Sequence, residues 1–152
     1  MNNATTNHQF RDYSLLLLRL VVVFVFLYHG FPKALDWPMA AEKFVGFGLP
    51  GFLGPITGIV EVVASAFILF GIFHRWSNLV LLFIIAGAIA TVQIPGSLSS
   101  GAVSAGLERD LLILAGTLVL VAFGPGALSL SSRSGLKGGM HKSEQSGVGS
   151  QF

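Results

Sequence analysis

Four apolar stretches separate the polar parts of this chain and constrain its fold more than any other feature. Each is close to the ~20 residues that an α-helix needs to cross a ~30 Å hydrocarbon core. At that depth only helices or a closed barrel satisfy their own backbone hydrogen bonds, and four strands are too few for a barrel. The sequence therefore predicts an all-α integral membrane bundle of four transmembrane helices, formed by Tyr13–Phe31, Ile56–Phe73, Trp76–Ile94 and Leu107–Gly124.

The composition agrees with a membrane protein and excludes several kinds of site. Of the 152 residues, 53% are hydrophobic and 11% are charged, whereas a soluble domain carries about 25% charged residues. The net charge of +2 is too small to indicate a nucleic-acid partner, and the absence of cysteine removes thiolate catalysis and iron–sulfur clusters. His29 and His74 fall at opposite faces of the predicted bundle, which disfavours a bis-histidine haem. We expect membrane lipids around the chain, no metal and no covalent cofactor.

The membrane domain, residues 13–130, is flanked by a polar N-terminal segment, residues 1–12, and a Ser/Gly-rich tail, residues 131–152. Arg19 interrupts the first apolar stretch and no small-residue cleavage site follows, so we interpret this stretch as a retained helix rather than a signal peptide. With four spans both termini lie on one side. That side carries more lysine and arginine than the other, which predicts cytoplasmic termini; its residues are Arg11, Arg75, Arg133, Lys137 and Lys142.

The first and third connections between the predicted spans differ in composition. Phe31–Gly54 contains Trp37 and Pro38 followed by a helix-like run, and proline is common in a first helical turn. Its aromatic residues suit the membrane interface, so we predict an interfacial loop with a short helix between the first two spans. Pro95–Gly106 is rich in serine and glycine and is predicted to be a loop.

Glu61 is the most informative single residue, because it lies inside the second apolar stretch. A carboxylate at membrane depth costs roughly 2.5–3.5 kcal/mol on insertion scales, so it usually faces a partner, a cavity or a ligand. Gly58 and Ser65 share its helix face, which should point into the bundle. Arg19 is a candidate ion-pair partner about 10 Å away in depth, and Arg109 matches the depth better. A structural Glu61–Arg pair and a proton-handling or ligand-binding carboxylate both remain open.

Other polar residues gather at the end of the bundle opposite the termini. His29 could hydrogen-bond a quinone carbonyl or relay a proton, but an interfacial histidine with a water partner explains it equally well. Asp110 could be no more than an acid favoured by the dipole at a helix start. The candidate ligand-binding cluster is His29, Lys33, Glu61, Arg109 and Asp110.

An ordered set of short motifs gives the chain a likeness to a known family. The motifs are Arg19-Leu20, Phe26–Gly30 with Lys33, Ala41–Phe44, Gly48–Pro50, Gly58–Glu61 and Phe73–Arg75. In this order they resemble the DoxX family of small bacterial four-helix membrane proteins, over Tyr13–Ser131. The resemblance implies a multi-pass protein of the bacterial inner membrane. DoxX-like and DoxD-like proteins are similar to a membrane subunit of a thiosulfate:quinone oxidoreductase, and others are linked to membrane-associated redox complexes.

Three functional hypotheses follow. The first is a membrane subunit of a quinone-linked redox complex, in an anchoring or accessory role and not catalytic alone. Because the sequence shows no electron carrier, such a subunit would bind a quinone or hold a partner subunit that has a cofactor. The alternatives are a purely structural accessory subunit of a large respiratory or photosynthetic complex, and a small transporter that uses Glu61. A quinone role predicts a cavity lined by His29 and Glu61, whereas transport predicts a path through the bundle.

Overall fold

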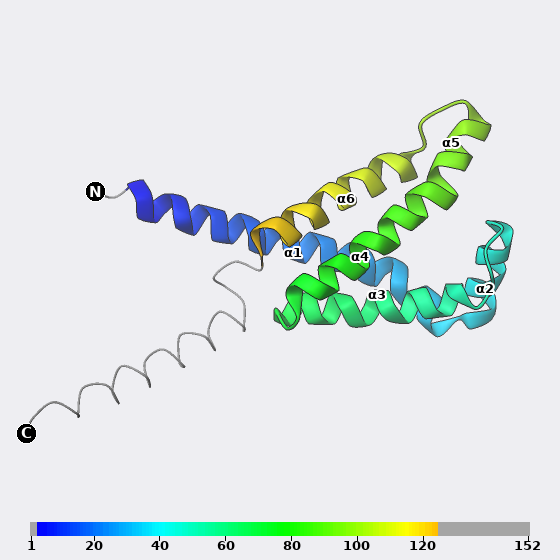
Figure 1. Ribbon diagram of the computed structural model, residues 1–152, viewed down its shortest axis with the longest axis horizontal. Helices are drawn as coiled ribbons and strands as arrows, with labels where there is room; N and C mark the ends of the chain where they lie inside the picture. Colours follow the sequence, from blue (N-terminus) through cyan, green and yellow to red (C-terminus); the bar gives the residue numbers. More distant parts are fainter. Residues whose placement is uncertain (1–2, 125–152) are drawn as a thin grey trace, which may run out of the picture.

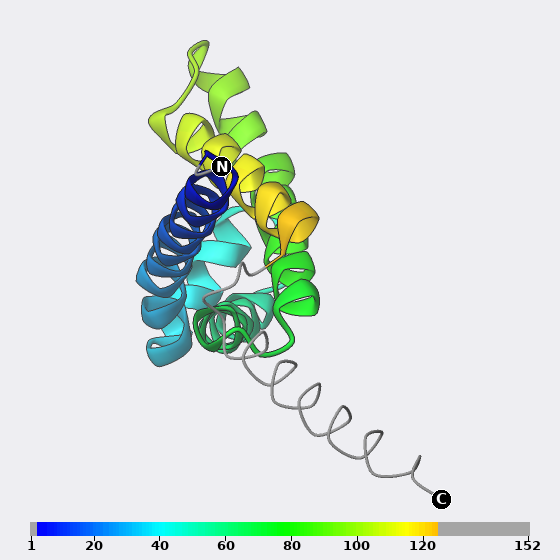
Figure 2. The same cartoon turned by 90° about the vertical axis from the view of Figure 1, so that its left-hand side faces the viewer.

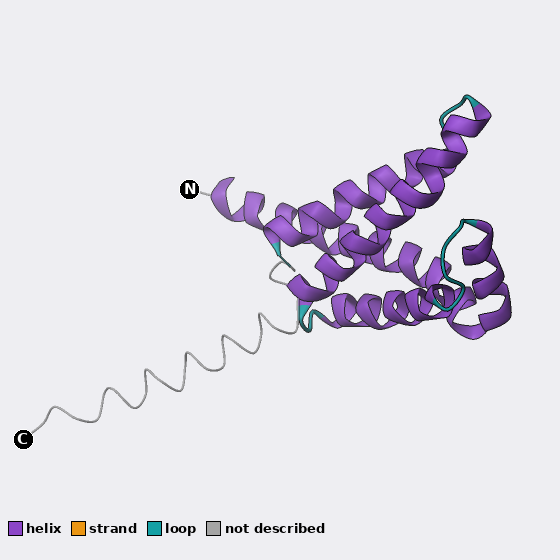
Figure 3. Cartoon of the chain, turned by 45° about the vertical axis from the view of Figure 1, so that its right-hand side comes forward, coloured by secondary structure: helices purple, strands orange, loops and turns teal. Residues whose placement is uncertain are grey.

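The computed structural model describes residues 3–124, and every regular element in this range is a helix (Figure 1, Figure 3). No strand occurs among these described residues, which confirms the predicted all-α class. The Ser/Gly-rich tail, residues 131–152, and both chain termini lie outside the described range. In chain order the elements are α1 (Asn3–Leu35), α2 (Trp37–Gly46), α3 (Leu53–Phe70), α4 (His74–Ala88), a π-helical stretch η1 (Ile89–Gln93), α5 (Ile94–Ser100) and α6 (Ala105–Phe123).

The first helix is longer than predicted at both ends. α1 begins at Asn3 rather than Tyr13, and it continues through Pro32 to Leu35. A proline inside a helix removes one backbone donor, but its carbonyl can still accept. The carbonyl of Pro32 accepts from the backbone N–H of Asp36 at 3.0 Å, so the last turn of α1 closes in spite of the proline.

The third predicted span is also longer, because α4 continues through η1 into α5. The predicted loop Pro95–Gly106 is therefore wrong as far as Ser100. In an α-helix the ring of Pro95 would clash with the carbonyl of Thr91. The π-helical turn at Ile89–Gln93 ends two residues before Pro95 and widens the backbone there, so the helix continues past the proline.

Three helical segments are long and apolar enough to cross a membrane: Gln9–Leu35, Leu53–Phe70 and His74–Ser100. α6 is similar in length to α3, but three charged residues, Glu108, Arg109 and Asp110, lie near its start. Figure 2 looks along the bundle and shows α1, α3, α4 and α6 as its four sides.

The predicted short helix between the first two spans is α2. The Asp36 side chain caps its start by accepting from the backbone N–H of Met39 at 3.1 Å, and Pro38 lies in its first turn. Ala40 is completely buried against α3, where a Cβ added to Gly54 would collide with the Ala40 carbonyl. α2 is therefore seated on the start of α3 rather than extended away from the bundle.

α1 and α3 pack most closely of all the helices, and two glycines allow it. A Cβ added to Gly58 would lie 2.6 Å from the backbone nitrogen of Ala34 and from the Cβ of Lys33. A Cβ added to Gly30 would lie 2.9 Å from the Cβ of Glu61. Small residues at such a crossing let two backbones approach in a membrane, where helix association depends on close packing.

An apolar cluster lies in the interior between α1, α3, α4 and α6, together with buried polar side chains that include Arg19, Ser65, Asn78 and Thr117. Its central residues Ile68, Leu81 and Leu120 have no exposed surface. The cluster continues along α1 through Val22 to Phe26. At the other end of the molecule α5 and the start of α6 diverge from α2 and the start of α3 (Figure 1).

We predict that Gly58→Ala lowers the free energy of unfolding by about 1–3 kcal/mol, because the new methyl group meets backbone atoms that cannot move aside. The measurement is reversible denaturation in mixed micelles. Gly96→Ala is the matched control: Gly96 is also helical and has open space around it, so its substitution should be neutral or stabilise by up to ~1 kcal/mol. Equal effects of the two substitutions would contradict the close α1–α3 contact.

Candidate ligand-binding site

A cavity of about 950 Å³ lies at the end of the molecule where α5 and the start of α6 diverge from α2 and the start of α3. Its walls are formed by residues of α1, α2, α3, α4, η1 and α6. Its volume is within the range of small-molecule sites, roughly 300–1,000 Å³. Most of the wall is apolar, and its larger apolar side chains include Phe26, Phe44, Phe47, Phe83, Ile84 and Ile113. Ligand sites typically combine such walls with a few polar groups that fix orientation.

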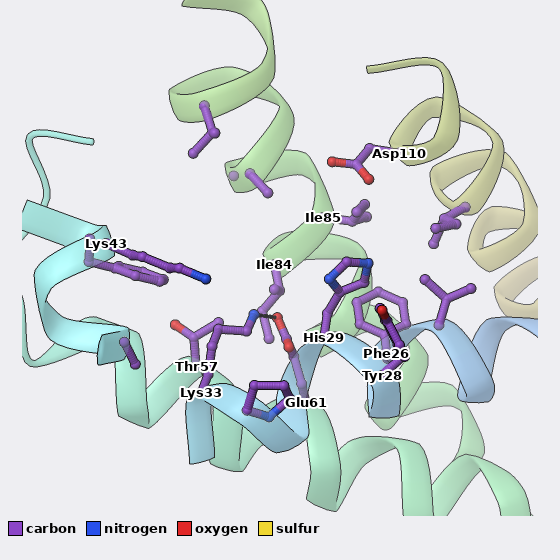
Figure 4. A pocket seen from close by; sticks show the side chains of 18 of the residues that line it. Phe26, Tyr28, His29, Lys33, Lys43, Thr57, Glu61, Ile84, Ile85 and Asp110 are labelled. Atoms are coloured by element: carbon purple, nitrogen blue, oxygen red, sulfur yellow. Dashed lines mark hydrogen bonds and ion pairs between the residues drawn. The ribbon is translucent and has the colours of Figure 1, made fainter. Parts of the chain in front are cut away.

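One polar group of the cavity is the ion pair between Lys33 of α1 and Glu61 of α3 (Figure 4). The Lys33 Nζ donates to Glu61 Oε1 at 2.6 Å, and the Glu61 side chain is only 4% exposed. The other carboxylate oxygen, Oε2, is buried and has no hydrogen-bond partner. This oxygen lies toward Gly30 of α1, where an added Cβ would be 3.2 Å from it, so the folded chain leaves this acceptor buried in the α1–α3 contact and unsatisfied.

The opposite wall carries a second polar group, built around Asp110 of α6. The Nε of Arg109 donates to Asp110 Oδ1 at 2.9 Å, and the amide of Gln93 donates to Oδ2 at 2.8 Å. The Ser104 hydroxyl, which caps α6, donates to Gln93 Oε1 at 3.3 Å. Gly106 leaves room for this amide, since a Cβ there would lie 2.6 Å from Gln93 Oε1. These contacts connect Asp110 of α6 to η1 and fix the position of its carboxylate.

His29 projects into the space between these two walls (Figure 4). Its ring meets the ring of Tyr28 edge to face, with centroids 5.3 Å apart. Lys43 of α2 and Thr57 of α3 also line the cavity. The cavity thus brings together all five residues of the candidate cluster, His29, Lys33, Glu61, Arg109 and Asp110.

The predicted ion pairs between Glu61 and an arginine are wrong. Glu61 pairs with Lys33, and Arg109 pairs with its neighbour Asp110. Arg19 is 4% exposed and does not line the cavity. The physical reason is the glycine contact between α1 and α3, which places the Lys33 side chain beside Glu61. The Glu61 carboxylate is therefore already paired with a cation from the neighbouring helix.

Gln93 and Lys43 also line the cavity, although neither is in the predicted ligand-binding cluster. A usable signal existed for Gln93, because it is an uncharged polar residue near the end of an apolar run and two residues before a proline. For Lys43 no such signal existed. Lysine is common in the last turn of a helix because it interacts favourably with the helix dipole, so its position in α2 does not indicate a ligand site.

Comparison with known proteins identifies the family. The DoxX family model matches residues 14–94. An uncharacterized protein of Haemophilus influenzae is 30% identical over 135 residues, covering 88% of this chain and 97% of the relative. The chain therefore belongs to the DoxX family. No solved structure matches it.

Two further relatives carry informative names. The Bacillus subtilis protein "Putative oxidoreductase CatD" is 27% identical over 76% of this chain and 82% of its own length. The Escherichia coli "Inner membrane protein YphA" is 27% identical over 81% of this chain and 91% of its own length. Together with the three apolar helical segments, the family confirms a multi-pass protein of the bacterial inner membrane.

We predict that Lys33→Met destabilises the protein by about 3 kcal/mol, because it leaves the buried Glu61 carboxylate without its cation. The double variant Lys33→Met/Glu61→Gln should recover most of this loss, since no charge remains buried. Denaturation in mixed micelles measures all variants. As a control, Arg11→Met breaks a pair of 3.8 Å whose arginine is 58% exposed, and should cost less than about 1 kcal/mol. A Lys33→Met effect no larger than that of Arg11→Met would contradict a structural Lys33–Glu61 pair.

Proposed function

We propose that this DoxX-family protein is a membrane subunit of a quinone-linked redox system and that its cavity binds a quinone ring. The observation that carries the proposal is the Lys33–Glu61 ion pair on the wall of a cavity whose other walls are mainly apolar: the Lys33 ammonium donates to Glu61 Oε1, and Oε2 of the same carboxylate has no hydrogen-bond partner. A quinone is an apolar ring whose oxygens accept hydrogen bonds when oxidised and donate them when reduced. Lys33 would donate to the oxidised form, and Glu61 would accept from the reduced form.

The second polar wall suits the other oxygen of the same ring. Quinone oxygens lie at opposite ends of the ring, and the polar groups of this cavity lie on opposite walls, with Lys33 and Glu61 on one and Asp110 on the other (Figure 4). The Gln93 amide donates to Asp110 on this second wall. His29 between them can donate or accept, depending on its tautomer. The apolar side chains would cover the ring faces.

The name of the Bacillus subtilis relative supports a redox role for this family of membrane proteins. We propose an anchoring or accessory role for this chain. A hydroquinone gives up two electrons and two protons, and the chain has no cysteine with which to bind an iron–sulfur cluster. The electrons would pass to or from a cofactor on a partner subunit.

We further propose that α6 is a fourth span and that both termini are cytoplasmic. The three charges of α6, Glu108, Arg109 and Asp110, lie at its start, where the cavity is, and the rest of the helix is uncharged. Charges are tolerated when they face a cavity or lie near the membrane surface. In this orientation the cavity occupies the outer half of the membrane.

Transport through a single chain is less well supported by the structure. Ile68, Leu81 and Leu120 are completely buried in the interior, in the apolar cluster that continues along α1 to Phe26 beside the cavity. A transport path for a polar solute needs polar groups or water along its whole length. The apolar cluster would have to open for such a solute to pass.

Quinone binding can be tested with the purified protein in nanodiscs and a short-chain naphthohydroquinone under anaerobic conditions. We expect Glu61→Gln to weaken binding about tenfold, because a hydrogen bond to a charged acceptor contributes about 1.5–3 kcal/mol. Glu108→Gln is the matched control: it makes the same chemical change in a carboxylate that does not line the cavity. Isothermal titration calorimetry measures both.

A second variant keeps the test independent of the ion pair. Gly87 lines the cavity and has open space beside it, so Gly87→Leu adds bulk without removing a polar group. We expect it to abolish hydroquinone binding while the protein remains folded. Unchanged binding in both Glu61→Gln and Gly87→Leu would rule out this cavity as the quinone site.

A further inference from the structure

We infer that Lys43 gives the cavity a preference for a quinone ring that carries a negative charge, such as a ring with an ionised hydroxyl group, over a neutral ring of the same shape. The inference rests on the proposed quinone site and specifies its ligand. It follows from the charges that line the cavity and from the position of α2.

The charges of the cavity do not balance. Its two carboxylates each have a cation of their own, because Glu61 pairs with Lys33 at 2.6 Å and Asp110 pairs with Arg109 at 2.9 Å. Lys43 is a third cation on the wall, and no ion pair joins it to an acid among the described residues. With His29 neutral, the cavity therefore has one positive charge in excess.

Lys43 is positioned to act on a ligand. Figure 4 shows its side chain extending from α2 into the cavity, toward the wall that carries Thr57, Lys33 and Glu61. The position of α2 is itself fixed, because Ala40 packs without exposed surface against Gly54 of α3. Helix packing thus fixes the backbone position of Lys43, and its exposed ammonium reaches the cavity on a flexible four-carbon stem.

The apolar walls increase the effect of this charge. Phe44 of α2 and Phe47, which directly follows α2, line the cavity on the same side as Lys43. A unit charge acts more strongly on a ligand where the surroundings have a low dielectric constant than it does in water. A ring bearing a negative charge would gain this interaction, and a neutral ring would not.

Lys43 also has an explanation that needs no ligand. It lies in the last turn of α2, where a cation interacts favourably with the helix dipole. That role predicts an effect on the stability of α2 and no effect on the choice between a charged and a neutral ligand. The two explanations are separated by a binding measurement with a matched pair of ligands.

The matched pair is 2-hydroxy-1,4-naphthoquinone, whose ring hydroxyl is ionised at neutral pH, and 2-methoxy-1,4-naphthoquinone, which stays neutral. Both are titrated into the full-length protein in nanodiscs of zwitterionic lipid. The quantity of interest is the ratio of the two dissociation constants in each variant, since partitioning of each probe into the lipid is the same for all variants.

We expect the wild-type protein to bind the ionised probe about tenfold more tightly than the neutral one. Lys43→Gln should remove this preference, so that the two dissociation constants become similar, and Lys43→Glu should reverse it. Arg75→Gln is the control for the loss of one positive charge, because Arg75 is exposed at the start of α4 and does not line the cavity. It should keep the wild-type ratio.

The outcomes distinguish this inference from the proposed function. If neither probe binds the wild-type protein, the quinone site itself is wrong. If both bind the wild-type protein with the same affinity, or if the preference survives in Lys43→Gln, the role of Lys43 is overturned while quinone binding stands.

Discussion

The close contact between α1 and α3 is the feature on which the rest of the structure depends. Gly30 faces Glu61 and Gly58 faces Lys33, so each glycine makes room for one member of the ion pair. The same spacing that lets the two backbones approach also places a lysine beside a carboxylate that would otherwise be buried alone. Packing and electrostatics are thus satisfied by one arrangement, and the cavity begins directly beside it.

The cavity joins parts of the chain that are far apart in the sequence. Its ionisable groups come from α1, α2, α3 and α6, and the Gln93 amide comes from η1. Each polar wall is held in place by a different device, a glycine contact on the Lys33 side and a capped helix start on the Asp110 side. Such a site combines positioned polar groups with apolar walls, as small-molecule sites typically do.

Much of this arrangement could be predicted from the sequence. The apolar stretches identified the long helices, and the predicted cluster of His29, Lys33, Glu61, Arg109 and Asp110 is part of the cavity lining. The pairing of these residues could not be predicted, because it depends on how closely two helices approach. The predicted depth of the residues in the membrane favoured Arg109 as the partner of Glu61. In the structure the glycine contact brings Lys33 beside Glu61 instead. The continuation of the helix past Pro95 depends on a π-helical turn that has no simple sequence pattern.

The unequal lengths of the helices have a consequence for how the protein sits in a bilayer. Gln9–Leu35 and His74–Ser100 each have 27 residues, or about 40 Å of helix, whereas Leu53–Phe70 has 18 residues and about 27 Å. The two long segments exceed a ~30 Å hydrocarbon core and must tilt or project beyond it, while α3 fits it nearly upright. Because of this hydrophobic mismatch, a change in membrane thickness changes the tilt of the long helices. A change in the tilt of α4 and α5 relative to α3 alters the width of the opening between them.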